Sequence, residues 1–142
     1  MKWAAPASSN FSWTTYTPSL NQITLGNGTL VGRYVEITTG TIAFSVRLTI
    51  GSTTSFVSSY SEISLPFATK QATMVNCWFY DYSTNANFPS ISPVISAGGT
   101  GVSLRVLSKS GTYVDYTAVY SAVPFSWATD DYIILNGVYE KN

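Results

Sequence analysis

Residues 41–51 read T-I-A-F-S-V-R-L-T-I-G, and this stretch decides the fold class of the chain. Its large apolar residues fall on every second position, and most positions between them carry a hydroxyl group or the charge of Arg47. A period of two over ten residues is typical of a β-strand with one buried and one solvent-facing side. We therefore predict that Arg47 stays outside the core and that the alternating apolar side chains are buried together: Ile42, Phe44, Val46, Leu48 and Ile50.

The same alternation recurs along the chain, and no segment has a helical period. We predict strands over residues 23–25, 29–37, 41–50, 62–65, 72–82, 91–97, 102–107, 112–122 and 132–140, with a loop over residues 83–88. Turn signals such as Gly26-Asn27-Gly28 separate them. Short strands at spacings of about 8 to 12 residues indicate an all-β chain, a single antiparallel β-sandwich or jelly-roll-like domain.

Composition and chain organisation favour one domain with an extended N-terminal arm. The chain has 142 residues, of which only 10% are charged, whereas about 25% is usual. Low charge suits sheet surfaces that partner subunits cover. We expect a sandwich over residues 21–142 and an arm over residues 1–20, which Pro6 and Pro18 keep irregular. The arm's aromatic residues are expected to contact a neighbouring subunit or the assembly, with packing on the same subunit as the alternative: Trp3, Phe11, Trp13 and Tyr16.

Several functions are excluded by what the chain lacks. It has no histidine and a single cysteine, Cys77, so Ser-His-Asp and Cys-His catalysis and the usual zinc sites are ruled out. Seven basic and seven acidic residues are scattered, which argues against nucleic-acid binding. No apolar run approaches the roughly 20 residues of a membrane-spanning helix, and the N-terminal residues lack the apolar run of a secretory signal peptide. We expect no nucleic-acid partner and no membrane insertion.

The carboxylate side chains leave two functions open, glycoside hydrolysis and calcium binding. Glycoside hydrolysis needs only a pair of carboxylates, and seven are available, but most are expected at strand ends or turns, where they are solvated. Asp130-Asp131 could help to hold Ca²⁺, although aspartate before a strand is common without any metal. We expect no enzyme activity, no cofactor and no metal site. The carboxylates considered are Glu36, Glu62, Asp81, Asp115, Asp130, Asp131 and Glu140.

Aromatic residues are the more informative constellation. Trp and Tyr offer rigid amphipathic surfaces that suit sugars as well as proteins, although strand aromatics also pack on cross-strand neighbours. The set comprises Trp78, Tyr80, Tyr82, Phe88, Tyr113, Tyr116 and Tyr120. Because loops at the end of a sandwich commonly bind ligands, we predict a contact surface around residues 80–88. Its candidate residues are Tyr80, Asp81, Tyr82, Asn85, Asn87 and Phe88.

A set of short segments spans nearly the whole chain in a fixed order. The segments are Trp13-Thr14-Thr15-Tyr16-Thr17-Pro18, Thr24-Leu25-Gly26-Asn27-Gly28-Thr29, Gly32-Arg33-Tyr34, Leu48-Thr49-Ile50-Gly51-Ser52-Thr53, Ile63-Ser64-Leu65-Pro66, Val102-Ser103-Leu104-Arg105-Val106, Pro124-Phe125-Ser126-Trp127-Ala128-Thr129-Asp130 and Gly137-Val138-Tyr139-Glu140. Their order resembles a family of small virion proteins of tailed bacteriophages, the minor tail or tail-fibre type, often from phages of actinobacteria. One departure is Thr38-Thr39-Gly40, where the family tends to carry a Gly-Lys turn.

The resemblance implies a non-enzymatic virion structural protein, made in the host cytoplasm and located in the virion. It implies a homotrimeric β-sandwich that contacts other virion proteins. A tail-associated adhesin would bind a glycan on the host cell surface. The alternatives are a capsid decoration protein that stabilises the shell and a carbohydrate-binding module of cellular origin. No catalytic residues follow from the resemblance.

Overall fold

The structure, a computed structural model, describes residues 11–57 and 60–142, and every regular element in them is a β-strand, as the sequence predicts. No helix in this part of the chain could span a membrane. The strands are β1 (Thr14–Tyr16), β2 (Leu20–Asn21), β3 (Ile23–Thr24), β4 (Thr29–Thr38), β5 (Thr41–Thr49), β6 (Ser55–Phe56), β7 (Glu62–Ser64), β8 (Asn76–Asp81), β9 (Ala86–Ile91), β10 (Gly101–Ser103), β11 (Arg105–Ser110), β12 (Tyr113–Ala118) and β13 (Tyr132–Glu140).

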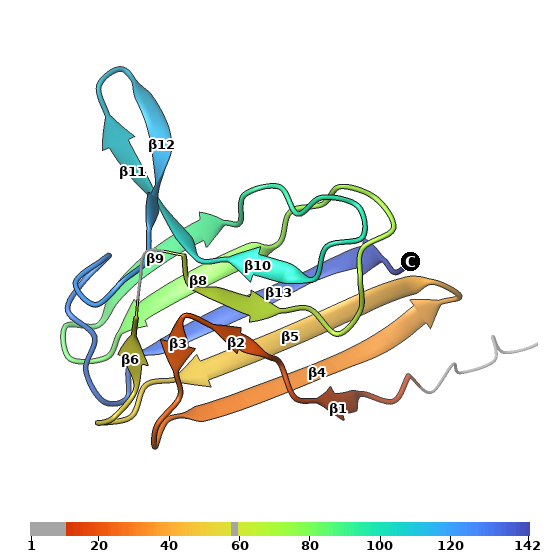
Figure 1. Ribbon diagram of the computed structural model, residues 1–142, viewed down its shortest axis with the longest axis horizontal. Helices are drawn as coiled ribbons and strands as arrows, with labels where there is room; N and C mark the ends of the chain where they lie inside the picture. The colour runs from red at the N-terminus through yellow and green to blue at the C-terminus, as the bar shows by residue number, and fades with distance from the viewer. Residues whose placement is uncertain (1–10, 58–59) are drawn as a thin grey trace, which may run out of the picture.

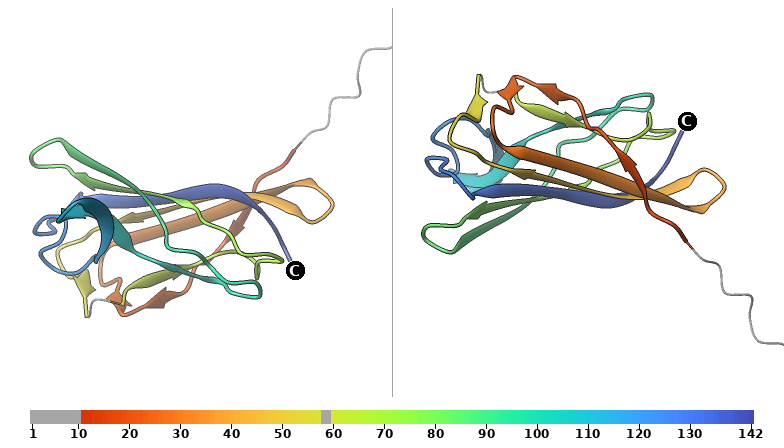
Figure 2. Two further views of the ribbon diagram at one scale, coloured as in Figure 1. Left: turned by 90° about the horizontal axis from the view of Figure 1, so that it is seen from above. Right: turned by 90° about the horizontal axis from the view of Figure 1, so that it is seen from below.

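Two antiparallel sheets form the layers of a β-sandwich (Figure 1). The larger sheet has the strand order β1-β4-β5-β13-β8-β9, and the smaller one has the order β10-β7-β2. Seen from above and below, the two sheets lie one over the other (Figure 2). The pairs β3-β6 and β11-β12 complete the described strands. The predicted all-β sandwich is confirmed.

The core lies between the two layers, and period-two alternation builds it. All five alternating apolar residues of the 41–51 stretch are buried, while Arg47 is exposed, so this prediction is confirmed. Ile133 and Leu135 of β13 and Phe79 of β8 join them from the larger sheet, and Ile63 and Val102 contribute from the smaller one. A fully buried large aliphatic side chain contributes about 1.5–3 kcal/mol, so these residues supply most of the driving force for folding.

The N-terminal segment differs from the predicted arm. From Thr14 onward it belongs to the sandwich, because β1 pairs with β4 in one sheet and β2 pairs with β7 in the other. The Tyr16 hydroxyl donates a hydrogen bond to the Ser64 carbonyl oxygen at 3.1 Å, which ties the two layers together. Gly32 permits this crossing, since a Cβ there would lie 2.8 Å from the Tyr16 ring. The sequence predicts an irregular arm here because a strand of three residues is too short to show a period of two.

Several strand predictions in the middle of the chain were also wrong. The expected loop over residues 83–88 is shorter, since Ala86–Ile91 forms β9. Of the strand expected over residues 91–97, only Ile91 lies in a strand, at the end of β9. Residues 72–75 are not part of β8, and the strand expected over 102–107 is divided between β10 and β11. Pro89 lies within β9, which is the edge of its sheet, where a missing N–H is tolerated.

Strands β11 and β12 pair as an antiparallel hairpin, and it projects from the body of the sandwich (Figure 1). Large apolar side chains near its tip face solvent, and Tyr113 is 81% exposed. Val106, at the base, is the hairpin residue that reaches the core. An isolated two-stranded hairpin has little stability in water by itself, so this element depends on its base or on a partner.

We predict that Phe44→Ala lowers the free energy of unfolding by about 3–5 kcal/mol, because it removes a fully buried ring and leaves a cavity. Phe44 is 2% exposed and packs edge-on against Tyr139, with ring centroids 5.8 Å apart. Denaturant unfolding monitored by tryptophan fluorescence measures the change. The matched control is Ser45→Ala, on the other side of the same strand, which we expect to change stability by less than about 0.5 kcal/mol. Equal effects of the two substitutions would contradict the assigned faces of β5.

Candidate functional site

The side of the larger sheet that points away from the core forms a broad surface, here called the outer sheet face. Cross-strand register arranges its residues in three rows across β4, β5, β13, β8 and β9. None of these side chains is buried. The rows are Thr29, Thr49, Tyr132, Tyr80 and Asn87; then Val31, Arg47, Ile134, Trp78 and Pro89; and finally Arg33, Ser45, Asn136, Asn76 and Ile91.

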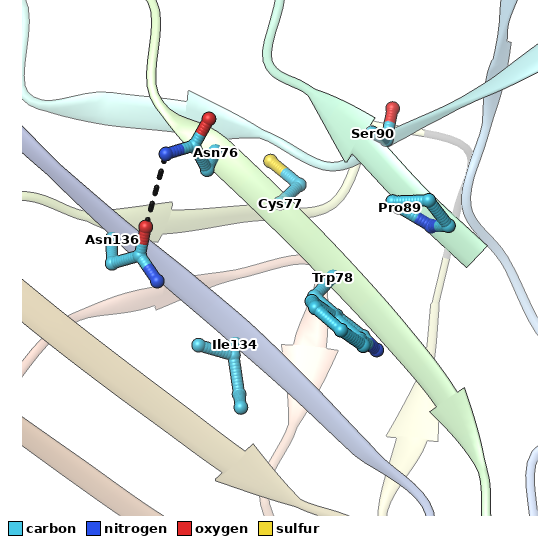
Figure 3. Close-up of a pocket in the computed structure, with 7 residues that line it drawn as sticks. All are labelled: Asn76, Cys77, Trp78, Pro89, Ser90, Ile134 and Asn136. Carbon is cyan, nitrogen blue, oxygen red and sulfur yellow. Dashed lines mark hydrogen bonds between the residues drawn. The ribbon is translucent and has the colours of Figure 1, made fainter. Parts of the chain in front are cut away.

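Two shallow depressions lie on the outer sheet face, and both include Ile134 in their lining. The aromatic depression, about 300 Å³, also contains the side chains of Asn76, Trp78, Pro89 and Asn136 (Figure 3). The arginine depression, about 350 Å³, is lined by Val31, Arg33, Ser45 and Arg47 as well. Because both are lined by Ile134, the two depressions lie side by side across the strands.

Trp78 is the main apolar surface of the aromatic depression. Its side chain is 45% exposed, and its indole Nε1 donates a hydrogen bond to Asn87 Oδ1 at 3.1 Å. That bond connects β8 to the edge strand and fixes the ring orientation. Trp78 therefore presents a held, solvent-facing aromatic surface, which ligands with apolar faces can contact.

An amide pair stands beside this ring. Asn76 Nδ2 donates a hydrogen bond to Asn136 Oδ1 at 3.1 Å (Figure 3). The remaining amide atoms, Asn76 Oδ1 and Asn136 Nδ2, form no hydrogen bond with the described residues. They supply one acceptor and one donor at the rim of the depression, the combination that a hydroxyl-rich ligand requires.

A stack of rings and one guanidinium group continues the face. The Arg47 guanidinium lies 4.1 Å from the centroid of the Tyr132 ring, and Tyr132 stacks on Tyr80 at 4.6 Å with 24° between the ring planes. The Tyr80 hydroxyl donates to Asn85 Oδ1, within the turn between β8 and β9. Asn85 has φ of 59°, a left-handed conformation that asparagine accepts more readily than most residues.

The six binding residues expected from the sequence do not form one surface. Tyr80 and Asn87 lie on the outer sheet face, Asn85 is beside them, and Tyr82 is exposed in the turn. Asp81 and Phe88 point to the opposite side. Strand alternation is the reason, because β8 and β9 extend into the segment that had been interpreted as a loop.

Asp81 and Phe88 both have structural roles. One Asp81 carboxylate oxygen accepts hydrogen bonds from the Ser83 hydroxyl at 2.7 Å, the Ser83 N–H at 3.0 Å and the Thr84 N–H at 3.1 Å. The bonds from Ser83, followed by those from Thr84, hold the pKa of Asp81 below its ordinary value. Phe88 packs against Phe125 with ring centroids 5.4 Å apart, inside the sandwich.

Sequence reasoning missed half of the outer sheet face. Arg47, Tyr132 and Asn136 come from strands far from residue 80 in the chain, and only the strand order brings them beside β8. The available signal was Trp78 and Asn76, which alternate with the buried residues of their own strand. Continuing that alternation onto the last strand identifies Ile134 and Asn136, but only once the two strands are known to be neighbours.

The expected assembly contacts of the N-terminal segment have different environments. Tyr16 packs on Tyr34 of the same chain, with ring centroids 6.1 Å apart, and is therefore engaged within the subunit. Trp13 is half-exposed, and the Arg33 guanidinium lies 4.9 Å from its ring centroid. Phe11 is exposed, and its contact with a neighbour stays a prediction. Trp3 lies outside the described residues.

The remaining reactive groups are arranged for structure. Asp131 is buried and accepts hydrogen bonds from the Tyr82 N–H at 2.9 Å and the Ala128 N–H at 2.6 Å, so its carboxylate joins the corner before β13 to the β8–β9 turn. Burial raises the pKa of the Cys77 thiol to about 12, which keeps it protonated and a poor nucleophile. Residues 11–57 and 60–142 contain no cluster of three or more His, Cys, Asp and Glu side chains that could hold a metal ion.

Comparison with models of protein families, with curated proteins and with solved structures finds no match for this chain.

We predict that Asp81→Asn lowers the free energy of unfolding at neutral pH. In acid, the free energies of unfolding of the variant and of wild type should become more similar. The folded-state pKa of Asp81 is depressed, so the ionised carboxylate stabilises the fold above the ordinary aspartate pKa of about 3.9. This stabilisation is lost as the pH falls through the depressed value. Unfolding midpoints measured from pH 7 to pH 2.5 test the expectation.

Ser83→Ala is the matched variant for this experiment, since it removes one donor and leaves the carboxylate in place. We expect the transition in its stability profile to shift toward the ordinary aspartate pKa. If the unfolding midpoints of wild type and Asp81→Asn differed by the same amount from pH 7 to pH 2.5, the stabilising role of the ionised Asp81 carboxylate would be contradicted.

Proposed function

We propose that this chain is a non-enzymatic component of a bacteriophage virion, an adhesion or receptor-binding protein of the tail that attaches to saccharides on the host surface. The virion assignment is supported by the ordered segments that resemble minor tail and tail-fibre proteins. The binding assignment is supported by the outer sheet face. The observation that carries it is the combination of an exposed, held Trp78 with the open amide atoms of Asn76 and Asn136.

Saccharide chemistry matches this combination. A pyranose ring has apolar C–H groups on its faces and hydroxyl groups around its rim. The faces pack on aromatic rings, and the hydroxyls exchange hydrogen bonds with side-chain amides. Trp78 offers the ring surface, while the amide pair offers one donor and one acceptor beside it. The two neighbouring depressions suit a linear polymer lying across the strands.

Binding is favoured over turnover by the lining of the same depressions. Glycoside hydrolysis ordinarily needs two carboxyl groups flanking the scissile bond. Neither depression is lined by Asp or Glu. Asp81 and Asp131, the buried carboxylates nearest in sequence to Tyr80 and Tyr132, accept backbone hydrogen bonds and point away from the outer sheet face.

We predict that Trp78→Ala weakens saccharide binding at least about tenfold, equivalent to ~1.4 kcal/mol, because the ring supplies the main apolar contact. The measurement is binding of purified protein to an array of bacterial surface polysaccharides, followed by titration calorimetry on the best ligand. Tyr113→Ala is the control, since it removes an even more exposed aromatic side chain from the projecting hairpin. Retained affinity in Trp78→Ala, or an absence of any saccharide ligand for wild type, would overturn the binding assignment.

A second candidate is a structural role in the virion, such as a capsid decoration protein, and the projecting hairpin favours it. Leu107 and Tyr116 oppose each other on one side of the hairpin, and Val114 continues that side toward the tip. These apolar side chains are exposed. A second copy of the chain covering this side would supply the buried surface that a two-stranded hairpin lacks, and a trimer would follow from head-to-tail contacts of this kind.

We predict that the double substitution Leu107→Ser and Tyr116→Ser converts an oligomer into a monomer if the hairpin is the subunit contact. Light scattering coupled to size-exclusion chromatography gives the mass. Trp78→Ala, on a different surface, is expected to leave the mass unchanged. A wild-type monomer at all concentrations would remove the second candidate, whereas a trimer that persists in the double variant would assign the contact to another surface.

A further inference from the structure

The outer sheet face carries positive charge without a compensating carboxylate. Arg33 and Arg47 are the charged residues in its three rows. The ion pair found among the described residues joins Lys141 to Glu36, and neither group belongs to those rows. Two guanidinium groups therefore face solvent on a surface that is otherwise aliphatic, aromatic, amide or hydroxyl in character.

Both arginines line the arginine depression and are neighbours across the sheet. Arg33 lies directly opposite Ser45, and Arg47 is two residues along the same strand as Ser45. The backbones of such diagonal neighbours are about 7–8 Å apart, and both long side chains reach the lining of the same depression. Ser45 also lines the depression, and its hydroxyl makes no hydrogen bond with the described residues.

Aromatic rings hold the two guanidinium groups in place. Arg33 lies over Trp13 at 4.9 Å and Arg47 over Tyr132 at 4.1 Å, measured to the ring centroids. A guanidinium stacked on a ring keeps its N–H donors, which lie in the guanidinium plane, available for a second partner. The stacked side chains have also lost part of their rotamer freedom before a ligand arrives, and this lowers the entropic cost of binding.

We propose that the arginine depression binds an anionic group, a carboxylate or a phosphate, so that the ligand of the outer sheet face is an acidic glycan. The inference rests on the proposed saccharide-binding function and specifies its ligand class. The two guanidinium groups can only donate hydrogen bonds, and the Ser45 hydroxyl can donate one more. Such a set of donors suits a carboxylate or a phosphate. Val31 and Ile134 line the depression beside them and offer apolar contact to the neighbouring part of the ligand.

The shared residue Ile134 sets the order of groups in the ligand. A sugar ring packed on Trp78 lies on one side of Ile134, and the anionic group lies on the other side. The ligand is therefore a polymer that carries its charge on the unit next to the ring held by Trp78. A neutral glycan would fill the aromatic depression alone and would leave both arginines unpaired.

Charge also argues against a second copy of the chain as the occupant of this face. A twofold contact would bring the same surface of each subunit together and place four guanidinium groups in one interface. No carboxylate in the three rows would neutralise them. An acidic polymer neutralises the same charges and keeps the aromatic contact.

The test compares one polymer with and without its charge. Polygalacturonate and its methyl ester share the same rings, and a glucosylated poly(glycerol phosphate) teichoic acid, which carries both sugar rings and phosphates, supplies the phosphate arm. Titration of wild type, Arg33→Gln, Arg47→Gln and the control Lys109→Gln is made at 50 mM and 500 mM salt. Lys109 is exposed on the projecting hairpin, so its substitution removes an equal charge elsewhere. Circular dichroism and thermal unfolding confirm that each variant is folded.

We expect wild type to bind at least one acidic polymer about tenfold more tightly than the methyl ester, and to lose that preference in 500 mM salt. Each arginine substitution should weaken binding of the acidic polymer about tenfold and leave binding of the methyl ester unchanged, as Lys109→Gln should leave both. Tighter binding by the teichoic acid identifies phosphate as the anion, and tighter binding by polygalacturonate identifies carboxylate.

Different results would overturn the acidic ligand and the saccharide-binding function. Equal affinity for polygalacturonate and its ester, combined with weak binding of teichoic acid, would reject the acidic ligand while leaving saccharide binding intact. If the arginine substitutions weakened binding of acidic and neutral polymers equally, Arg33 and Arg47 would only support the neighbouring aromatic rings and would not bind an anion. A protein that binds acidic polymers and is unaffected by both arginine substitutions would place the anion elsewhere. If no polymer on the wider saccharide array binds to wild type, the proposed function itself fails.

Discussion

The rest of the structure depends on the pairing of the C-terminal strand β13 between β5 and β8. Its register with β5 runs from Tyr132 opposite Thr49 to Glu140 opposite Thr41 without interruption. On its other side it pairs with β8 from Tyr132 to Asn136. Without β13 the larger sheet would divide into two unconnected pieces. Because the pairing joins segments far apart in sequence, the sheet closes only after a long loop of chain has been ordered.

This strand also fixes both functional sides of the sheet at once. Ile133 and Leu135 point into the core, while Ile134 and Asn136 point to the outer sheet face. A slip of one residue would exchange the two sets and destroy the core together with the aromatic depression. The candidate site therefore requires no stabilising elements of its own. It is the reverse side of the register that the hydrophobic core already enforces.

The margins of the sandwich are closed mainly by aromatic and polar contacts, beside the Lys141–Glu36 ion pair. Tyr139 donates from its hydroxyl to the Phe67 carbonyl oxygen and accepts from the Phe67 N–H, while burial raises its pKa to about 12. No buried side-chain polar atom in the described part of the chain lacks a hydrogen-bond partner. The short edge strand β1 and the proline in β9 limit edge-to-edge pairing of the larger sheet. These contacts explain how a chain with so few charges forms a defined sandwich.

Sequence alone determined the features that depend on local alternation and turn chemistry. It gave the all-β class, the inward set from Ile42 to Ile50, the bounds of the last strand and the hairpin near Gly111, because each follows from neighbouring residues. It failed where short strands carry no period, as in β1, and where β9 occupies part of the segment expected to be a loop. Tertiary structure alone decided which strands are neighbours. Arg47, Tyr132 and Trp78 come from three strands, so their shared face arises from strand order, a non-local property that no stretch of sequence encodes by itself.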